Sequence, residues 1–390
     1  MTPIPIRSAQ LRQQLVTTLI NSGALHSPAI TQAFLSIPRE AFIPFFLEQS
    51  ESPRLDWVRH EAVMSEPTAY LEQIYTDQPL VTKLDDRKMP ASSSSLPSIM
   101  VKMLEALDMQ PGHTALEVGT GTGYNAALLA QITGSPAHVS TIDVDPILTA
   151  SAIAALEHTI GPGVTVIIGD GFQGYPLNAP YDRIIVTASI PTVPPPLIDQ
   201  LAPGGKLVMD LQGSLASGFL VIDKTEDGIV GHFRPEPLHF MPLFSDAIAA
   251  PDVPRIKDLQ QHDPCALPAH HPFPDILNDY AFRWFLQWRI PGCQVTQTRP
   301  IQRQSGTPIP TISVVDPHHR TIARFQRHPE HQEWTLTTYG SQASLWDTLL
   351  QAYHEFVSLG KPQPHNSILT VEDKQPMITI GSLKLPVRTS

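Results

Sequence analysis

The segment 116–124, Leu-Glu-Val-Gly-Thr-Gly-Thr-Gly-Tyr, restricts the possible folds of this chain more than any other. An apolar run over residues 114–118 predicts a strand, and the run 124–130 predicts a helix directly after it. Glycine at 119, 121 and 123 allows positive φ and lets a ligand approach the backbone, where the N–H groups of the first helical turn face it. The sequence therefore predicts a nucleotide-type loop at the end of a first parallel strand, with an ordinary strand-to-helix turn as the alternative.

The glycine spacing indicates which nucleotide the loop binds. The pattern is G-x-G-x-G, whereas the dinucleotide loop has its third glycine one residue later, for close helix packing beside a pyrophosphate. The spacing favours a ligand with a ribose and an amino-acid tail, such as S-adenosylmethionine. An oxidoreductase that uses a dinucleotide is the weaker alternative.

Two acidic residues follow the next two predicted strands. Asp143 ends the strand 139–142, where a carboxylate meets ribose hydroxyls in such sheets, and Asp145 with Pro146 fits the start of a helix better. Asp170 lies between two glycines after the strand 164–168, where it is either a plain turn residue or an acceptor for the adenine amino group. Three strand ends would then converge on one crevice, as ligand sites in open α/β sheets do.

Composition excludes several classes of protein. The net charge of −11 argues against a protein that binds a phosphate backbone, and no apolar run reaches the length of a membrane span. Two cysteines, Cys265 and Cys293, make no disulfide framework, and the N-terminus has no apolar signal core, so a cytoplasmic location is expected. The histidines do not have the spacing of a compact metal site, so no metal is predicted; they are His262, His270, His271, His318, His319, His328 and His331.

The chain alternates strand and helix from residue 114 to 209, with strands expected near 114–118, 139–142, 164–168, 183–187 and 206–211. Helices are expected over 8–22, 27–35 and 97–107, and residues 48–73 are expected to be irregular. We predict a catalytic domain with N-terminal helices over 1–245, a proline-rich linker over 246–275 and a C-terminal α+β domain over 276–390. That last domain is expected to hold helices near 275–289 and 343–359 and strands near 311–315, 320–326, 333–339, 367–371 and 377–380.

Over most of residues 8–245 the sequence resembles protein-L-isoaspartate O-methyltransferases. The resemblance rests on the order and spacing of short segments at 37–44, 75–80, 117–124, 169–171, 179–188, 197–205 and 241–243. It implies a Rossmann-like S-adenosylmethionine-dependent methyltransferase sheet with helices on both faces, within an α/β fold. It also implies transfer of the methyl group to the free carboxylate of an L-isoaspartyl residue, whose ester then cyclises to a succinimide.

Two departures from the family bear on the acceptor. Where the family has Gln-Thr-Ile-Ser, this chain has serine at all four positions, 92–95, which an arbitrary protein would use as a flexible loop. The second departure is the extension after 245. Together they resemble the relatives that methylate an ordinary Asp side chain of a constrained, ribosomally made precursor peptide, giving aspartimide or isoaspartate. We favour this reading over housekeeping repair of L-isoaspartyl residues in damaged proteins.

The chemistry requires no triad and no metal, because a carboxylate is already a nucleophile and a sulfonium is already activated. It requires in-line alignment and removal of water from the carboxylate. The acceptor-side residues predicted on this basis are Ser93, Ser94 and Ser95. The residues predicted to bind S-adenosylmethionine are Glu117, Gly119, Thr120, Gly121, Gly123, Asn125, Asp143, Val144, Asp170, Gly171 and Thr187.

The expected partner is a peptide or protein that carries Asp or isoAsp, with no nucleic acid and no membrane; the sequence does not indicate an oligomeric state. In the extension, we expect most of the aromatic and basic candidates for peptide contact to be core residues instead, Trp284 and Trp288 above all; the others are Arg289, Trp334 and Tyr339. A non-catalytic peptide-binding protein with a methyltransferase-like domain is the alternative from another class, and the complete glycine loop with both acids argues against it.

Overall fold

The computed structural model describes residues 4–50, 56–61, 67–245, 253–268, 270–298, 310–327, 333–340, 345–372 and 375–387. Within these ranges the chain forms two compact units. Unit 1 holds residues 1–210, 221–229 and 238–245, and unit 2 holds 211–220, 230–237 and 246–390. Residues 211–220 and 230–237 are grouped with unit 2, although they precede residue 245 in the sequence.

The sheet of unit 1 has the strand order β10-β9-β8-β5-β6-β7. Strands β5, β6, β7 and β8 run parallel, so their carboxyl ends meet at one edge. The strands are β5 (Ala115–Val118), β6 (Val139–Asp143), β7 (Thr165–Ile168), β8 (Tyr181–Ile190), β9 (Leu201–Gln212) and β10 (Ser217–Thr225). The five expected strands are confirmed, whereas β10 and β11 (Gly228–Phe233) were not expected.

Several helices of this unit begin where the sequence supplies a start signal. Asp145 caps α6 by accepting the N–H groups of Ile147 and Leu148, as expected, and Ser27 caps α2. Strand β5 is fully buried, so the glycine loop that follows it stands on the core of the unit. The helices of this unit are α1 (Ile4–Asn21), α2 (Pro28–Ser36), α3 (Pro67–Ile74), α4 (Pro97–Leu107), α5 (Tyr124–Thr133), α6 (Pro146–Ile160) and α7 (Pro195–Gln200).

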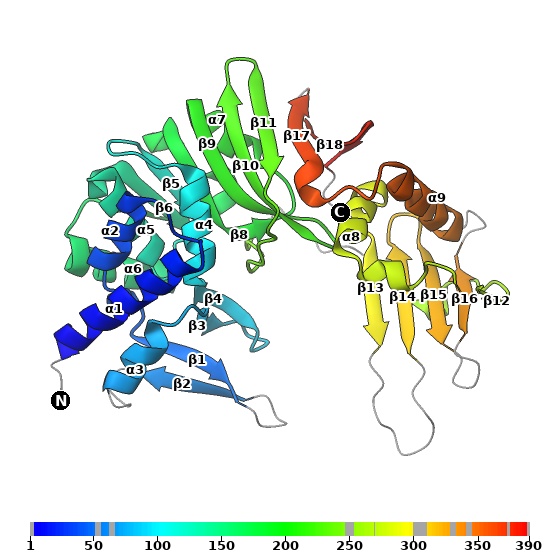
Figure 1. Cartoon of the computed structure of the whole chain (residues 1–390), viewed down its shortest axis with the longest axis horizontal. Helices are drawn as coiled ribbons and strands as arrows, with labels where there is room; N and C mark the ends of the chain where they lie inside the picture. Colours follow the sequence, from blue (N-terminus) through cyan, green and yellow to red (C-terminus); the bar gives the residue numbers. More distant parts are fainter. Residues whose placement is uncertain are drawn as a thin grey trace. The chain divides into compact units, whose positions relative to one another are not determined.

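A second, four-stranded antiparallel sheet in unit 1 carries the serine run (Figure 1). Its order is β2-β1-β3-β4, with β1 (Phe45–Gln49), β2 (Trp57–Glu61), β3 (Leu80–Leu84) and β4 (Pro90–Ser94). The expectation of an irregular segment over 48–73 is wrong for β2 and α3. Tyr70, Leu71 and Ile74 of α3 are buried, so tertiary packing orders a segment whose sequence pattern alone is weak.

Unit 2 contains a five-stranded antiparallel sheet, β12-β16-β15-β14-β13, with α8 and α9 packed together beside it (Figure 1). Its helices are α8 (Tyr280–Arg289) and α9 (Leu345–Ser358). Its strands are β12 (Cys265–Ala266), β13 (Gln294–Thr298), β14 (Thr311–Asp316), β15 (Thr321–Arg327) and β16 (Trp334–Tyr339). The strands β17 (Ser367–Glu372), β18 (Gln375–Ile380) and β19 (Leu383–Pro386) extend from β11 in the order β11-β17-β18-β19.

Aromatic side chains form much of the core of unit 2. Phe325 of β15 stacks on Phe273 at 6.0 Å between ring centroids, and Trp284 and Trp288 of α8 are both buried. The expectation that these two tryptophans are core residues is confirmed. Tyr339 is buried as well, and Arg289 pairs with Glu355 of α9 at 2.8 Å. Part of the expected linker, residues 246–252 and 269, lies outside the described residues.

Candidate active site

The glycine loop leaves β5 at Val118 and enters α5 at Tyr124. Gly119, Gly121 and Gly123 all have positive φ, at 100°, 50° and 83°. The N–H of Gly119 donates to Ile142 O at 2.8 Å, which holds the loop against the end of β6. A Cβ atom at Gly119 would lie 2.7 Å from Thr187 Oγ1, so both the conformation and the space at this position require glycine.

The two predicted acids lie at the ends of β6 and β7, where Asp143 pairs in register with Ile168. Asp143 Oδ2 accepts the N–H of Gly121 at 2.9 Å, so its carboxylate lies directly beside the loop. Asp170 Oδ1 accepts the N–H of Phe172 at 3.0 Å, which makes it the first residue of a short turn. The ends of three parallel strands thus bring the loop, Asp143 and Asp170 to one edge of the sheet.

Glu117 lies beneath the loop and is 1% exposed. Its carboxylate accepts hydrogen bonds from Asn125 Nδ2 and Thr141 Oγ1, both at 2.7 Å, and Thr141 in turn contacts Thr120 Oγ1 at 2.8 Å. Burial raises the pKa of Glu117 to about 7, although the two hydrogen bonds favour the charged form. This network joins β5, β6, the loop and α5, so Glu117 supports the loop from below.

The predicted cofactor residues therefore form two groups. Gly119, Gly121, Asp143, Val144 and Asp170 lie at the rim of the strand ends, with the Val144 side chain 49% exposed. The other group lies beneath or behind the rim: Glu117, Thr120, Asn125, Gly123, Gly171 and Thr187. A rim of bare glycine backbone flanked by two carboxylates fits a ligand with ribose hydroxyls, an adenine amino group and a compact tail.

The serine run forms strand β4 and is not a flexible loop. Ser92 and Ser94 are buried and Ser93 is half-buried, as the alternation of a strand requires. Ser95 follows the strand and is half-buried as well. The Ser94 hydroxyl faces inward and accepts hydrogen bonds from the buried Arg39, so the prediction of Ser94 as an acceptor-facing group does not fit its position.

Strand β4 passes close to the glycine loop. A Cβ atom at Gly121 would lie 3.7 Å from Ser92 Oγ and 3.8 Å from the carbonyl oxygen of Ser93. Strand β4 and the glycine loop are therefore neighbours, and a methyl-sized group at Gly121 would reach van der Waals contact with the strand.

Several residues that sequence reasoning missed also lie at this site. Lys83 of β3 forms an ion pair with Asp145, next to the rim residue Val144. Ser245 Oγ donates to Asp170 Oδ2 at 2.8 Å, and Leu243 lies against Gly171. Only Leu243 had a signal in the sequence, because it belongs to the Met-Pro-Leu segment that resembles the family.

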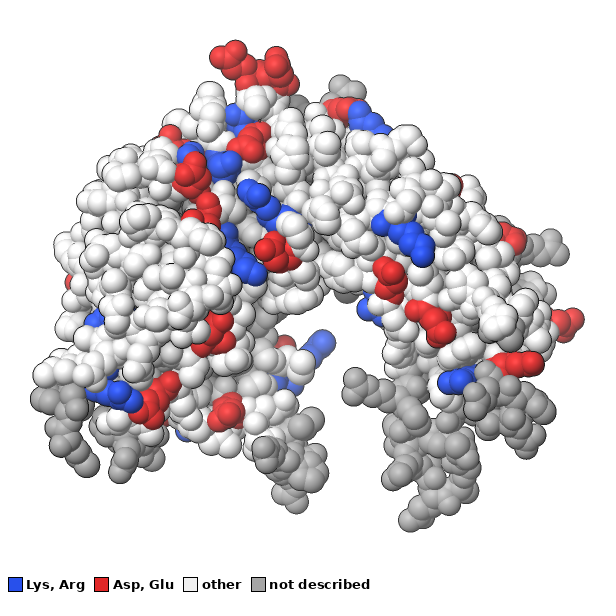
Figure 2. Space-filling model, viewed as in Figure 1, with Lys and Arg blue, Asp and Glu red and all other residues white. Residues whose placement is uncertain are grey.

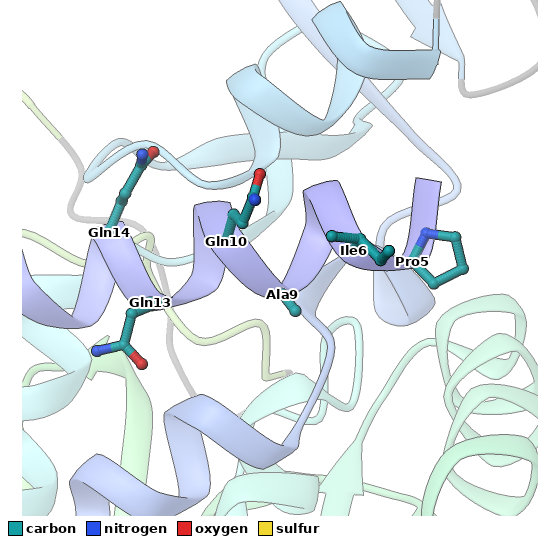
Figure 3. A pocket seen from close by; sticks show the side chains of 6 residues that line it. All are labelled: Pro5, Ile6, Ala9, Gln10, Gln13 and Gln14. Atoms are coloured by element: carbon teal, nitrogen blue, oxygen red, sulfur yellow. The ribbon is translucent and has the colours of Figure 1, made fainter. Parts of the chain in front are cut away.

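Surface features elsewhere do not form a comparable site. Lys and Arg are interspersed with Asp and Glu on the face in Figure 2, most of which is uncharged. Among the described residues, a hollow along α1 is lined by Pro5, Ile6, Ala9, Gln10, Gln13 and Gln14 of that helix (Figure 3). Within the described ranges, no three His, Cys, Asp or Glu side chains could hold a metal ion, and no helix is long and apolar enough to cross a membrane. His328 and His331 lie outside the described residues.

The parallel sheet, the glycine loop at its edge and the acids at the next two strand ends define a Rossmann-like methyltransferase. The family model for protein-L-isoaspartate(D-aspartate) O-methyltransferase matches residues 55–247. The protein-L-isoaspartate O-methyltransferase of Hyperthermus butylicus is 36% identical over 245 residues, which cover 61% of this chain and 90% of that protein. That of Methanopyrus kandleri is 34% identical over 236 residues, covering 60% of this chain and 92% of that protein. The chain belongs to the protein-L-isoaspartate O-methyltransferase family.

A solved structure named protein-L-isoaspartate O-methyltransferase is similar over a greater length. It has a TM-score of 0.56 and 21% identity, and the match covers 94% of this chain and 99% of that one. The predicted fold class is confirmed, including a sheet-rich C-terminal part. The predicted cofactor is confirmed at the level of the family, which uses S-adenosylmethionine.

Proposed function

We propose that this chain methylates the free α-carboxylate of L-isoaspartyl residues in damaged proteins, with S-adenosylmethionine as the donor. The observation that carries the proposal is the approach of β4 to Gly121, which brings the Ser92 hydroxyl and the backbone carbonyl of Ser93 beside the loop. The family named for this activity supports it, because its model matches residues 55–247, which include both the glycine loop and β4.

When bound, S-adenosylmethionine supplies a methyl group already activated on a sulfonium. The protein has three tasks. The glycine loop and the carboxylates of Asp143 and Asp170 bind and orient the donor. Ser93, on the less buried face of β4, and Ser95, directly after the strand, place the acceptor carboxylate with their hydroxyl and N–H groups. Close packing of β4 on the loop keeps water from the carboxylate, and no general base is required because the nucleophile is ionised at neutral pH.

The comparisons favour repair over the precursor-peptide reading that the sequence suggested. The extension after 245 is one reason for that reading. The match to the solved structure named protein-L-isoaspartate O-methyltransferase nevertheless covers 94% of this chain. An extension of this size therefore does not by itself indicate a different acceptor. The serine run remains a departure from the family, and it keeps ordinary Asp in a constrained peptide as the second candidate.

Two peptides that differ only in the linkage of one residue test the acceptor. One carries L-isoAsp and the other carries Asp, and each is incubated with the protein and S-adenosylmethionine. We expect a mass gain of one methyl group, followed by loss of methanol to the succinimide, with the isoAsp peptide alone. Methylation of the Asp peptide or of its cyclic form, with none of the isoAsp peptide, would support the second candidate instead.

A calorimetric titration with S-adenosylhomocysteine separates an enzyme from a non-catalytic peptide-binding protein. The proposal requires saturable binding that Asp143→Ala weakens. A protein that binds the peptide but not S-adenosylhomocysteine contradicts it.

A further inference from the structure

Arg39 is a charged residue in unit 1 to which the proposed chemistry assigns no role. It begins the short helical turn Arg39–Phe42 and is 0% exposed. Its guanidinium donates to Ser95 O at 3.1 Å and, through Nε and Nη2, to Ser94 Oγ at 3.3 Å. It therefore contacts the serine strand from its buried side.

The same guanidinium also holds the segment that follows α3. Nη1 donates to the carbonyl oxygens of Ile74 at 2.8 Å and Thr76 at 3.1 Å, and Nη2 donates to Gln78 O at 3.2 Å. Within that segment, Asp77 Oδ1 accepts the N–H of Ser98 at 2.8 Å in the first turn of α4. One side chain thus joins the helical turn, the 74–78 segment and the end of β4.

Every acceptor that the Arg39 guanidinium has among the described residues is a carbonyl or hydroxyl oxygen, and no carboxylate forms an ion pair with it there. Burial lowers the pKa of Arg39 to about 10, so it stays protonated at neutral pH. Tyr124, Tyr75 and Asp77 act on this charge through space, although none of them forms an ion pair with it among the described residues. A buried cation of this kind favours further negative charge nearby, and its field is screened less than one at the surface.

We propose that Arg39 is a positioning residue for the acceptor carboxylate. It fixes the end of β4 so that Ser93 and Ser95 face the acceptor, and its buried charge favours the ionised acceptor beside them. This inference rests on the proposed function, since it concerns the acceptor side of that site. The hydrogen bonds of the Arg39 guanidinium are to β4, to Ser95 and to the 74–78 segment. Its effect is therefore expected on acceptor binding and not on the affinity for S-adenosylmethionine.

The geometry requires arginine at this position. The planar guanidinium has five N–H donors in a fixed fork, whereas lysine has three donors on one nitrogen and cannot reach acceptors on both sides. Arg39→Lys therefore keeps the charge and loses hydrogen bonds, and Arg39→Gln removes the charge. Arg183→Lys is the matched control, because Arg183 is also buried and donates to backbone carbonyls, at Asp108 and Asp182, but not to β4.

The experiment measures the acceptor KM, kcat and the S-adenosylhomocysteine Kd of the full-length variants. For Arg39→Lys we expect an acceptor KM about tenfold higher, as for one or two lost hydrogen bonds, with a Kd near that of the wild type. For Arg39→Gln we expect the acid limb of kcat/KM for the acceptor to move to higher pH, because the acceptor then loses its proton less readily. An Arg39→Lys variant whose acceptor KM matches that of Arg183→Lys overturns the proposal.

Hydrogen exchange keeps the inference testable if Arg39→Gln does not fold or if the wild type methylates no isoaspartyl peptide. The second result would refute the proposed function and not the role of Arg39. In Arg39→Lys, amides of residues 91–96 should exchange faster than in the wild type, and those of β6 should not change. Unchanged exchange over 91–96 contradicts the positioning role whatever the activity.

Discussion

Lys83 of β3 forms an ion pair with Asp145, the residue that caps α6. Burial opposes ionisation of Asp145, but hydrogen bonds from Lys83 and from the N–H groups of Leu148 and Ile147 lower its pKa below the usual value. The pair joins the β3–β4 hairpin, which carries the serines, to the helix that begins beside Asp143 and Val144. The acceptor and donor sides of the site therefore share a polar contact in addition to the packing at Gly121.

We expect Lys83→Met to weaken both sides of the site together. The side chains of Lys83 and Asp145 are 34% and 17% exposed, so the loss should be modest, a rise of about fivefold at most in acceptor KM and in S-adenosylhomocysteine Kd. Lys206→Met is the control, since Lys206 pairs with Asp223 at 2.6 Å on β9 and β10 and should change neither constant. Added salt should raise the acceptor KM and the S-adenosylhomocysteine Kd of the wild type, and it should raise those of Lys83→Met less. A change in the acceptor KM alone would contradict the coupling.

Alanine at three glycines separates backbone strain from loss of space. Gly134→Ala, at φ +81° with nothing within 4 Å of the new Cβ, should cost only the strain of positive φ, about 1 kcal/mol. Gly119→Ala adds an overlap with Thr187 Oγ1 and should lose S-adenosylhomocysteine binding. Gly121→Ala has ordinary contacts with Ser92 and Ser93 and should fold, yet lower kcat by filling the gap between loop and β4. Thermal midpoints and calorimetric Kd values check Gly134→Ala and Gly119→Ala, and kcat together with the thermal midpoint checks Gly121→Ala. Equal loss of stability in Gly119→Ala and Gly134→Ala would contradict the steric argument.

Local sequence signals predicted the glycine loop and the start of α6 because the geometry of both is local. The glycine loop needs three positive φ angles within five residues, and Asp145 with Pro146 marks a helix start, so both can be read from a short window. Asp143 and Asp170 follow from the rule that parallel strand ends converge. Val144 at the rim and Glu117 beneath it are neighbours of these positions, but the pattern does not reveal which of the two faces the ligand.

The acceptor side depends on contacts between residues far apart in the sequence. Four consecutive serines predict a loop, and the strand they form is specified by pairing with β3 and by Arg39, which lies 55 residues from Ser94. Lys83 and Ser245 reach their partners across 62 and 75 residues. No periodicity records such contacts, so β4, Lys83 and Ser245 could be placed only from the structure.

The hydrogen bond from Ser245 to Asp170 predicts a specific effect on donor binding. Ser245 Oγ donates to Asp170 Oδ2 at 2.8 Å while the N–H of Phe172 holds Oδ1, so both carboxylate oxygens are oriented. Ser245→Ala removes one of these constraints and should raise the S-adenosylhomocysteine Kd by about fivefold with the acceptor KM unchanged. Ser151→Ala, which removes a hydroxyl bonded only within α6, is the control. An equal effect of the two changes would show that the hydrogen bond to Asp170 does not orient the donor site.

Glu117 predicts how the stability of the wild-type protein depends on pH. Burial raises its pKa in the folded state to about 7, above the ordinary value of 4.5. Between these two values the unfolded chain loses this proton while the folded chain keeps it, so stability from this group is full below pH 4.5 and is lost as the pH rises to about 7. The shift corresponds to about 3 kcal/mol at most.

Glu117→Gln has no proton to lose, and its amide can still accept from Asn125 and donate to Thr141. We therefore expect the thermal midpoint of Glu117→Gln, relative to wild type, to increase between pH 5 and pH 8. Glu226→Gln, on the exposed turn between β10 and β11, controls for a general change of charge and should show no such increase. A midpoint difference for Glu117→Gln that is constant or falls over this range would mean that Glu117 is ionised in the folded protein, and that the network beneath the loop holds a charge.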